Sequence, residues 1–375
     1  MKVAELLVEC LKNEGVKVMF GLPGEENLDV MDAIHDSGIR FVLTRHEQGA
    51  AFMADVHGRL TGEAGVCLST LGPGATNLIT GVADAYLDRA PMVVLTGQVD
   101  LGRLHKESHQ HIDLVEMFRP ITKWNTQVVY PSTVTEAIRK AFKVAQMEKP
   151  GPTHLDLPED VARMEVHDSP LPVNRPRGGV PAEREIERAL TEIQNSESPM
   201  IIAGNGVLRG RASEALTRFA EAFQIPVVNT FMGKGAISYR NPLSILTVGL
   251  QSEDPFYWGL EPADLIISVG YDLVEYAPKF WNPDRNKKII HIDTQPAEVD
   301  AHYNVQVGLI GGISGSLKRL TAKAYPRKQP KLPEIRKVIQ GQLQTFRDDR
   351  SYPLKPQKIV ADMRAVMGDD DILIS

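Results

Sequence analysis

Residues 65–81 read GVCLSTLGPGATNLITG, which is a short apolar run, a glycine-rich turn and a stretch of helix-forming residues. Gly72, Pro73 and Gly74 let the backbone turn without side-chain bulk, and the helix that follows begins with N–H groups that can bind a ligand. The stretch is not a phosphate-binding P-loop, because the GK[ST] ending of that motif is missing. Taken alone, it fits a ligand-binding turn and a close strand-to-helix packing turn equally well.

The same order of strand, turn and helix repeats through residues 1–166. Runs rich in Val, Leu and Ile are typical of a parallel sheet that helices cover on both faces. They occur at residues 16–20, 41–44, 65–70, 92–97 and 153–158. Ligands bind such sheets at the carboxyl ends of the strands. The glycines that we expect at this edge are Gly21, Gly24, Gly72, Gly74 and Gly97.

Three further segments follow this first α/β domain. Residues 167–186 are rich in proline, glycine and charge, which is typical of an interdomain linker. Residues 187–325 repeat the alternation and predict a second α/β domain. Residues 326–375 end in the strand-like DILIS, and we interpret them as a linker and the start of a truncated third domain. The predicted fold is therefore α/β, with two doubly wound parallel-sheet domains.

Composition favours a soluble cytoplasmic protein. The net charge of −6 and the lack of a basic stripe argue against a nucleic-acid partner. No apolar run is long enough to span a bilayer, and the amphipathic N-terminus lacks the features of a signal peptide. Cys10 and Cys67 lie in apolar runs, so we expect reduced core residues.

Other motifs have weaker chemical interpretations. His109 and His111 are two residues apart, but neither an HExxH nor a CxxC motif accompanies them, so we predict no metal site. The stretch GNGVLRG (204–210) resembles half of a dinucleotide fingerprint, with Arg209 at the position of the third glycine. The glycines of GLPGEENLD (21–29) fit a tight turn with two glutamates near a helix start. Glu47 lies between an apolar strand and a helix rich in small residues.

Several motifs together resemble one family, the thiamine-diphosphate (ThDP) enzymes of the acetolactate synthase group. The resemblance covers nearly the whole chain and is carried in the first domain by FGLPGEENLD (20–29), RHEQGAA (45–51), GPGATN (72–77), HQHIDLVEMF (109–118) and GPTHLDLPEDV (151–161). It implies that residues 1–166 bind the cofactor's aminopyrimidine. The cofactor-binding residues that it implies are Pro23, Gly24, Glu47, Thr70, Gly72 and Asn77.

The resemblance also assigns roles to individual residues. In that family the glutamate of the RHE motif, here Glu47, contacts N1′ of the aminopyrimidine and is the catalytic residue. A carboxyl group shielded from water can exchange a proton there and so activate the thiazolium carbon. The alternative is a solvated glutamate at a helix N-terminus. Gln110 matches a glutamine beside the substrate, and His109 stands where many biosynthetic members carry phenylalanine, so the HQ form is similar to the catabolic branch.

The second domain is similar to the FAD-independent members. VGYDLVEYAPKFWN (269–282) resembles their pattern and has no arginine between Gly270 and Trp281, whereas biosynthetic members carry an arginine-rich segment against FAD. We therefore expect no FAD. LIGGISG (309–315) lacks the aspartate that relatives have after the first glycine.

The implied function is the condensation of two pyruvates to 2-acetolactate with release of CO₂, by a homodimer or homotetramer with ThDP and Mg²⁺. Family members bind the metal and diphosphate through a GDG…N segment in a third domain, and here Gly-Asp occurs only at Gly368–Asp369. We therefore expect the 375-residue chain alone to be inactive. The alternatives are another ThDP-dependent 2-keto-acid decarboxylase or carboligase, and a non-catalytic two-domain paralogue.

Overall fold

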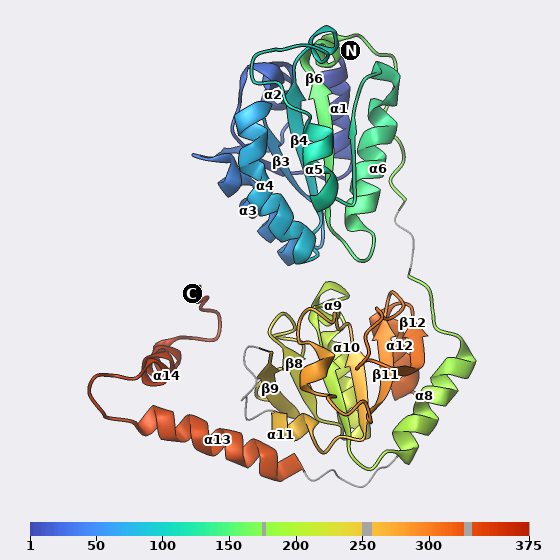
Figure 1. The fold of residues 1–375 in the computed structure, drawn as a ribbon, viewed down its shortest axis with the longest axis vertical. Helices are drawn as coiled ribbons and strands as arrows, with labels where there is room; N and C mark the ends of the chain where they lie inside the picture. The colour runs from blue at the N-terminus through green and yellow to red at the C-terminus, as the bar shows by residue number, and fades with distance from the viewer. Residues whose placement is uncertain (175–177, 250–256, 326–331, 375) are drawn as a thin grey trace. The chain divides into compact units, whose positions relative to one another are not determined.

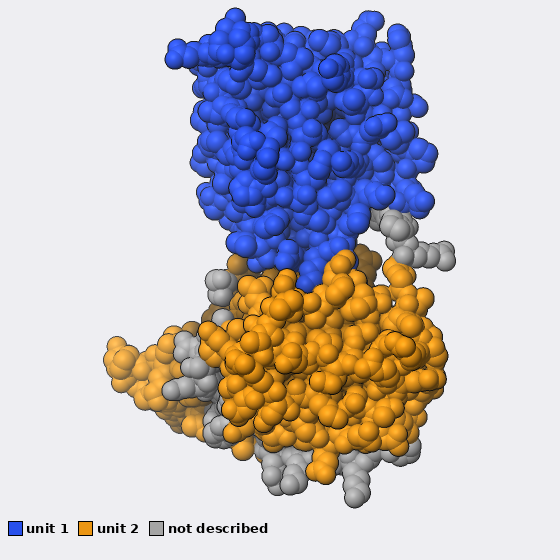
Figure 2. Space-filling model, turned by 45° about the vertical axis from the view of Figure 1, so that its right-hand side comes forward, with its two compact units in different colours: residues 1–177 blue, residues 178–375 orange. Residues whose placement is uncertain are grey.

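The computed structural model of the chain describes residues 1–174, 178–249, 257–325 and 332–374. These residues form two compact units, residues 1–177 and 178–375, which Figure 2 shows in different colours. Each unit contains one six-stranded sheet in which every neighbouring pair of strands is parallel. The predicted α/β fold with two parallel-sheet domains is confirmed.

The first sheet has the strand order β2-β1-β3-β4-β6-β5. Its strands are β1 (Val18–Gly21), β2 (Arg40–Leu43), β3 (Gly65–Ser69), β4 (Met92–Gln98), β5 (Trp124–Gln127) and β6 (Pro152–Pro158). The helices of this unit are α1 (Val3–Asn13), α2 (Leu28–His35), α3 (Glu47–Thr61), α4 (Gly72–Leu87), α5 (Leu114–Phe118), α6 (Val134–Gln146) and α7 (Glu159–Arg163).

Helices cover both faces of this sheet because its central strands are apolar on both faces. Val66 and Leu68 of β3 pack in a core with α1, α2, α6 and α7, whereas Cys67 between them packs in a second core with α3, α4 and α5 (Figure 1). Cys10 and Cys67 are both buried and form no disulfide, as expected of reduced core residues.

The second sheet has the strand order β12-β11-β10-β7-β8-β9. Its strands are β7 (Pro199–Ala203), β8 (Val227–Thr230), β9 (Ser244–Val248), β10 (Leu265–Val269), β11 (Lys288–Asp293) and β12 (Val305–Ile310). The helices are α8 (Glu183–Asn195), α9 (Asn205–Arg209), α10 (Ser213–Phe223), α11 (Tyr257–Leu260), α12 (Ile313–Thr321), α13 (Leu332–Asp348) and α14 (Pro356–Val366).

Alternate residues of β7 again face two cores. Ile201 packs with α8, α10 and α12, and Ile202 packs with the aromatic side chains of Tyr271, Trp281 and Tyr303 on the other face of the sheet.

Two details of the sequence interpretation were wrong. The strands β5, β9 and β12 were not predicted. Helix α8 begins at Glu183, inside the segment 167–186 that we interpreted as linker. The stretch DILIS is strand-like in sequence, and its residues 371–374 form neither a strand nor a helix, while Ser375 lies outside the described residues.

Candidate functional site

Glu47 is held at the start of α3 by its neighbours in sequence. The strand β2 ends at Leu43, and His46 caps the helix by accepting a hydrogen bond at Nδ1 from the Gln48 N–H (3.1 Å). The Glu47 side chain is buried, with an exposed fraction of 6%. Its Oε2 accepts a hydrogen bond of 2.9 Å from Nδ2 of Asn77, while none of the described residues donates to Oε1. One carboxylate oxygen is therefore fixed, and the other is available to a ligand.

The helices α3 and α4 bring Glu47 and Asn77 together because they pack very closely. A Cβ atom on Gly81 would lie 2.6 Å from Cβ of Ala51, so only glycine fits at this crossing. Further along the same two helices, Arg59 of α3 forms ion pairs with the three carboxylates of Asp55, Asp84 and Asp88. These contacts fix the distance between the two helices that carry the site.

The turn before α4 forms one wall of the site. Gly72 has a φ of +50°, which L-residues with a side chain rarely adopt. A Cβ atom on Gly74 would lie 2.7 Å from Oγ of Ser69, 2.9 Å from Cγ2 of Thr70 and 3.4 Å from Oε1 of Glu47. A side chain at Gly74 would clash with Ser69 and Thr70, so glycine lets the turn lie close to these residues and to the open oxygen of Glu47.

The loop after β1 lies directly on this wall. A Cβ atom on Gly24 would lie 2.4 Å from Cβ of Thr70, and Oγ1 of Thr70 donates a hydrogen bond of 2.5 Å to Oε2 of Glu26. Gly97, in β4, touches the backbone of Glu26 in the same way. Glu26 is a contact of this site that the sequence interpretation assigned only to a helix start.

The structure brings most of the predicted cofactor residues together. Gly24, Glu47, Thr70 and Asn77 are linked by the contacts given above, and Gly72 lies in the same turn as Gly74.

Two of the predicted residues, Pro23 and His109, are exposed, and their roles stay predictions. Gln110 is also exposed, but its backbone packs against the turn, since a Cβ atom on Gly72 would lie 2.5 Å from the Gln110 carbonyl oxygen.

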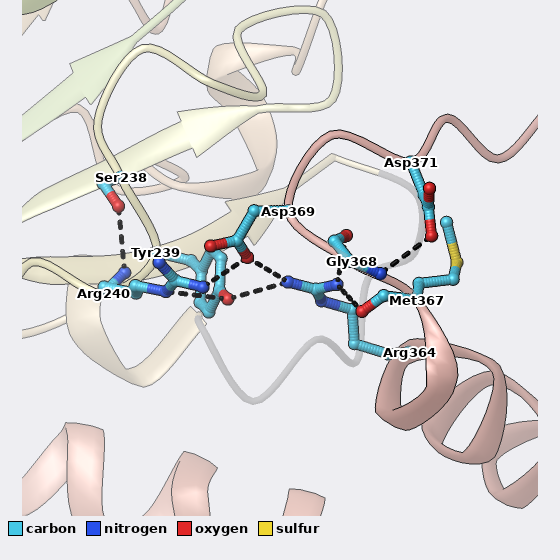
Figure 3. Close-up of polar contacts among 8 residues, drawn as sticks. All are labelled: Ser238, Tyr239, Arg240, Arg364, Met367, Gly368, Asp369 and Asp371. Carbon is cyan, nitrogen blue, oxygen red and sulfur yellow. Dashed lines mark hydrogen bonds and ion pairs between the residues drawn. The ribbon is translucent and has the colours of Figure 1, made fainter.

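Asp369 of the Gly368–Asp369 pair is engaged in ion pairs (Figure 3). Its Oδ1 accepts hydrogen bonds from Nη2 of Arg240 (2.6 Å) and Nη2 of Arg364 (3.2 Å), and the Gly368 N–H donates to Asp371 Oδ2 (2.8 Å). Among the described ranges, no group of three or more His, Cys, Asp or Glu side chains could hold a metal ion.

No helix in the described part of the chain is long and apolar enough to cross a membrane.

The second unit also has a carboxylate beside a glycine turn at the carboxyl edge of its sheet. Both oxygens of Glu275 accept from the Asn205 N–H at 3.1 Å, and Oε2 also accepts from the Thr230 hydroxyl. Oε1 accepts from the Asp272 N–H at 3.3 Å as well. Burial raises the pKa of Glu275 to about 7. A Cβ atom on Gly204 would lie 2.9 Å from Oε2, so the carboxylate occupies the half-fingerprint turn itself.

Comparisons with known proteins agree with this division into two units. Residues 1–117 match the family model described as "Thiamine pyrophosphate enzyme, N-terminal TPP binding domain", and residues 186–320 match the "central domain" of the same enzymes. The "Acetolactate synthase, catabolic" of Raoultella terrigena is 34% identical over 376 residues, which cover 98% of this chain and 67% of that protein. The chain belongs to the acetolactate synthase family of thiamine pyrophosphate enzymes.

Other members of the acetolactate synthase family show the same coverage. The "Probable acetolactate synthase large subunit" of Methanocaldococcus jannaschii is 38% identical over 388 residues, which cover 99% of this chain and 65% of that protein. The "Acetolactate synthase" of Bacillus subtilis is 34% identical over 373 residues, with coverage of 98% and 65%. The chain therefore spans 65% of the length of these two relatives.

Three polar residues near the predicted substrate loop were missed by the sequence interpretation. They are linked by side-chain hydrogen bonds at the carboxyl edge of the first sheet, and one of them also contacts His111: Thr96, Gln98 and Asp156. Their signal in the sequence was a polar residue inside an apolar strand, as in MVVLTGQ and THLDLP.

Proposed function

We propose that the protein is an acetolactate synthase that joins two pyruvates with loss of CO₂, and that Glu47 exchanges a proton with N1′ of ThDP. The observation that carries the proposal is the asymmetry of the Glu47 carboxylate. Asn77 fixes Oε2, whereas Oε1 receives no hydrogen bond from the described residues. The names of the relatives support the reaction.

The residues around the open oxygen of Glu47 fit the aminopyrimidine of ThDP. When bound, ThDP supplies a carbon nucleophile and an electron sink for the decarboxylation of a 2-keto acid. Asn77 keeps the Glu47 carboxylate oriented, so that Oε1 can hold or release a proton at N1′. Thr70 and Gly24 pack together in the neighbouring wall, and Gly74 lets the turn lie close to Oε1. We propose a contact with the ring for Pro23 as well.

We assign the substrate side to the loop that contains Gln110 and His109. The Gln110 backbone packs on Gly72, so its side chain starts from the same turn that borders the cofactor space. Both side chains are exposed and carry hydrogen-bonding groups suited to the carboxylate of pyruvate.

We further propose that Mg²⁺ binds with the diphosphate, and that the described residues supply only the aminopyrimidine side of the site. Gly368–Asp369 is the one Gly-Asp pair in the sequence, as in the metal-binding segment of the family. Its carboxylate is already engaged in ion pairs with Arg240 and Arg364, which supports the proposal. The proposal that FAD is not bound is supported by Glu275, which occupies the half-fingerprint turn of the second unit.

Assembly as a homodimer or homotetramer is also a proposal. Helix α3 exposes four apolar side chains, at Phe52, Met53, Val56 and Leu60. Large exposed apolar groups that gather on one helix are typical of a protein interface.

Product analysis tests the proposed reaction. The protein is incubated with ThDP, Mg²⁺ and [2-¹³C]pyruvate, and the products are identified by ¹³C NMR. Acetolactate supports the proposal, whereas acetaldehyde alone would indicate a simple decarboxylase. Because the 375-residue chain alone is expected to be inactive, ThDP binding is measured first, by calorimetry, on the chain and on Glu47→Ala, which removes the hydrogen-bonding group. Equal affinity of the two forms would count against a contact between Glu47 and the cofactor.

A further inference from the structure

The backbone at Gln110 is held in an unusual conformation. Gln110 has a φ of +53°, in the left-handed region that residues with a Cβ atom rarely adopt. Its carbonyl oxygen and Cβ atom both pack against Gly72. A conformation of this kind persists only when the surrounding structure imposes it. Packing against Gly72 acts from one side, so a second restraint is needed on the residues that follow Gln110.

Gln98 supplies that second restraint. Its side chain is buried, with an exposed fraction of 1%, at the carboxyl end of β4. Its Nε2 donates to the Ile112 carbonyl oxygen at 3.2 Å, and its Oε1 lies 3.1 Å from Nδ1 of His111. One amide side chain therefore holds both residues that come directly after Gln110.

Asp156 sets the direction in which this amide points. Its Oδ2 accepts from Nε2 of Gln98 (3.3 Å) and from Nε2 of Gln127 (2.8 Å), and its Oδ1 accepts from the Thr96 hydroxyl (2.7 Å). Burial raises the pKa of Asp156 to about 6, so above that pH the carboxylate is ionised and only accepts.

The orientation of the amide also fixes the tautomer of the histidine ring. Since Nε2 of Gln98 must face the Asp156 carboxylate, Oε1 faces His111. An amide oxygen cannot donate, so Nδ1 of His111 carries the proton.

We propose that Gln98 and Asp156 are positioning residues that fix the Gln110 loop for the substrate. The proposal rests on the proposed function, in which Gln110 lies beside pyruvate. Gln98 acts through His111 and Ile112, and Asp156 acts through Gln98. Neither residue needs to touch the substrate, because the loop transmits the restraint to Gln110 through two adjacent peptide units.

Two substitutions of Gln98 separate its two hydrogen bonds to the loop. Gln98→Leu removes both of them with a similar side-chain volume. Gln98→Glu keeps an acceptor for Nδ1–H of His111 but loses the donor to Ile112 and places a second carboxylate beside Asp156. The matched control is Thr135→Val, which removes a buried side-chain bond to Asp168 (2.9 Å) in the same unit, on helix α6.

The first readout is the ¹⁵N NMR spectrum of the His111 ring, assigned with a His111→Asn variant. We expect the Nδ1–H form in the wild type, in Gln98→Glu and in Thr135→Val, and its loss in Gln98→Leu. The second readout is native-state hydrogen exchange at the His111 amide, which donates to the Ser108 carbonyl oxygen. Loss of hydrogen bonds of ordinary strength should accelerate it about tenfold in both Gln98 variants and not in the control.

Two results would overturn the proposal. One is a His111 ring that keeps the Nδ1–H form in Gln98→Leu, and the other is an equal acceleration of His111 amide exchange in Gln98→Leu, Gln98→Glu and Thr135→Val. The last readout is the side-chain amide resonance of Gln110 in the wild type when ThDP, Mg²⁺ and pyruvate are added together. Loss of the Nδ1–H form and faster exchange in the Gln98 variants support the positioning roles whether or not this resonance moves. If the Gln110 resonance does not move, only the assignment of Gln110 to the substrate is refuted, and the positioning roles are unaffected.

Discussion

The carboxyl edges of the two sheets differ in how each uses a glutamate. In the first unit, Glu47 has one oxygen fixed by Asn77 and one that receives no hydrogen bond from the described residues. In the second unit, both oxygens of Glu275 are bound by the Asn205 and Asp272 N–H groups and the Thr230 hydroxyl. The same architecture therefore presents a carboxylate with an open oxygen in one unit and a closed turn in the other.

The comparison shows that the sheet and its glycine turns do not decide function by themselves. A parallel sheet places polar groups at its carboxyl edge in both units. The number of internal donors around each carboxylate then decides whether it can accept a ligand. In the second unit the protein's own carboxylate takes the position that an anionic ligand would need, so we infer that this turn is structural.

The largest expected effect separates the two glutamates by catalysis. In a chain that also contains the diphosphate half of the cofactor site, Glu47→Gln should slow hydrogen–deuterium exchange at C2 of bound ThDP by about 10²–10⁴-fold, because an amide can hydrogen-bond N1′ but cannot exchange a proton with it. The matched substitution Glu275→Gln should leave the rate within about twofold. Proton NMR of the complex at saturating ThDP and Mg²⁺ measures both rates, and equal rates in wild type and Glu47→Gln would refute the catalytic role.

A smaller effect is expected from overpacking the turn next to Glu47. Gly74→Ala places a methyl group 2.7 Å from Oγ of Ser69 and 3.4 Å from Oε1 of Glu47, so the turn must shift beside the open oxygen. We expect ThDP affinity to fall about tenfold, in line with overpacking costs of about 1–3 kcal/mol. The control Gly49→Ala meets nothing within 4 Å and should bind ThDP normally. Calorimetric titration measures both affinities, and identical values would show that this turn does not contribute to the cofactor site.

The pH dependence of stability sharpens the comparison in the second unit. The pKa of Glu275 is raised from 4.5 to about 7, so the folded state binds this proton more tightly than the unfolded state. The resulting stabilisation is complete below pH 4.5 and is lost as the pH rises through about 7. Between pH 5 and 8 the free energy of unfolding should therefore fall by about 1–2 kcal/mol more in wild type than in Glu275→Gln. Urea unfolding at several pH values measures this, and parallel pH profiles would contradict the raised pKa.

The smallest expected effect is the absence of a response to FAD. Because Glu275 occupies the turn beside Gly204, we expect FAD to leave the unfolding temperature unchanged, whereas a ligand that binds the folded state would raise it. Thermal unfolding with and without FAD provides the comparison. A purified protein that is yellow and releases a flavin on denaturation would show that the second unit binds a nucleotide after all.

The sequence predicted central strands better than edge strands, for a physical reason. The strands β3, β4, β7 and β10 are buried on both faces, so they appear as continuous apolar runs. The three missed strands, β5, β9 and β12, are all at an edge of a sheet. An edge strand is partly exposed and tolerates polar residues, as in WNTQ of β5, so its composition is close to that of a loop.

The candidate site was predictable where one short motif contains the chemistry. Glu47 and Asn77 were each found in a motif, and the structure adds the hydrogen bond between them. The contacts of Gln98 with Ile112 and Asp156 could not be predicted, because they depend on the register of β4 against β6 and on the path of a loop. The same holds for Glu275, which meets the Asn205 N–H from 70 residues away in the chain.

The central claim is that the open carboxylate of Glu47, and not the turn beside Glu275, marks the ligand site. The most direct test is a titration of the ¹⁵N-labelled chain with ThDP and Mg²⁺, followed by two-dimensional NMR. We predict that the Gly74 amide and the Asn77 side-chain amide shift with a common binding curve, while the Gly204 and Gly206 amides stay unchanged. Shifts at Gly204 and Gly206 without any at Gly74 and Asn77 would contradict the account.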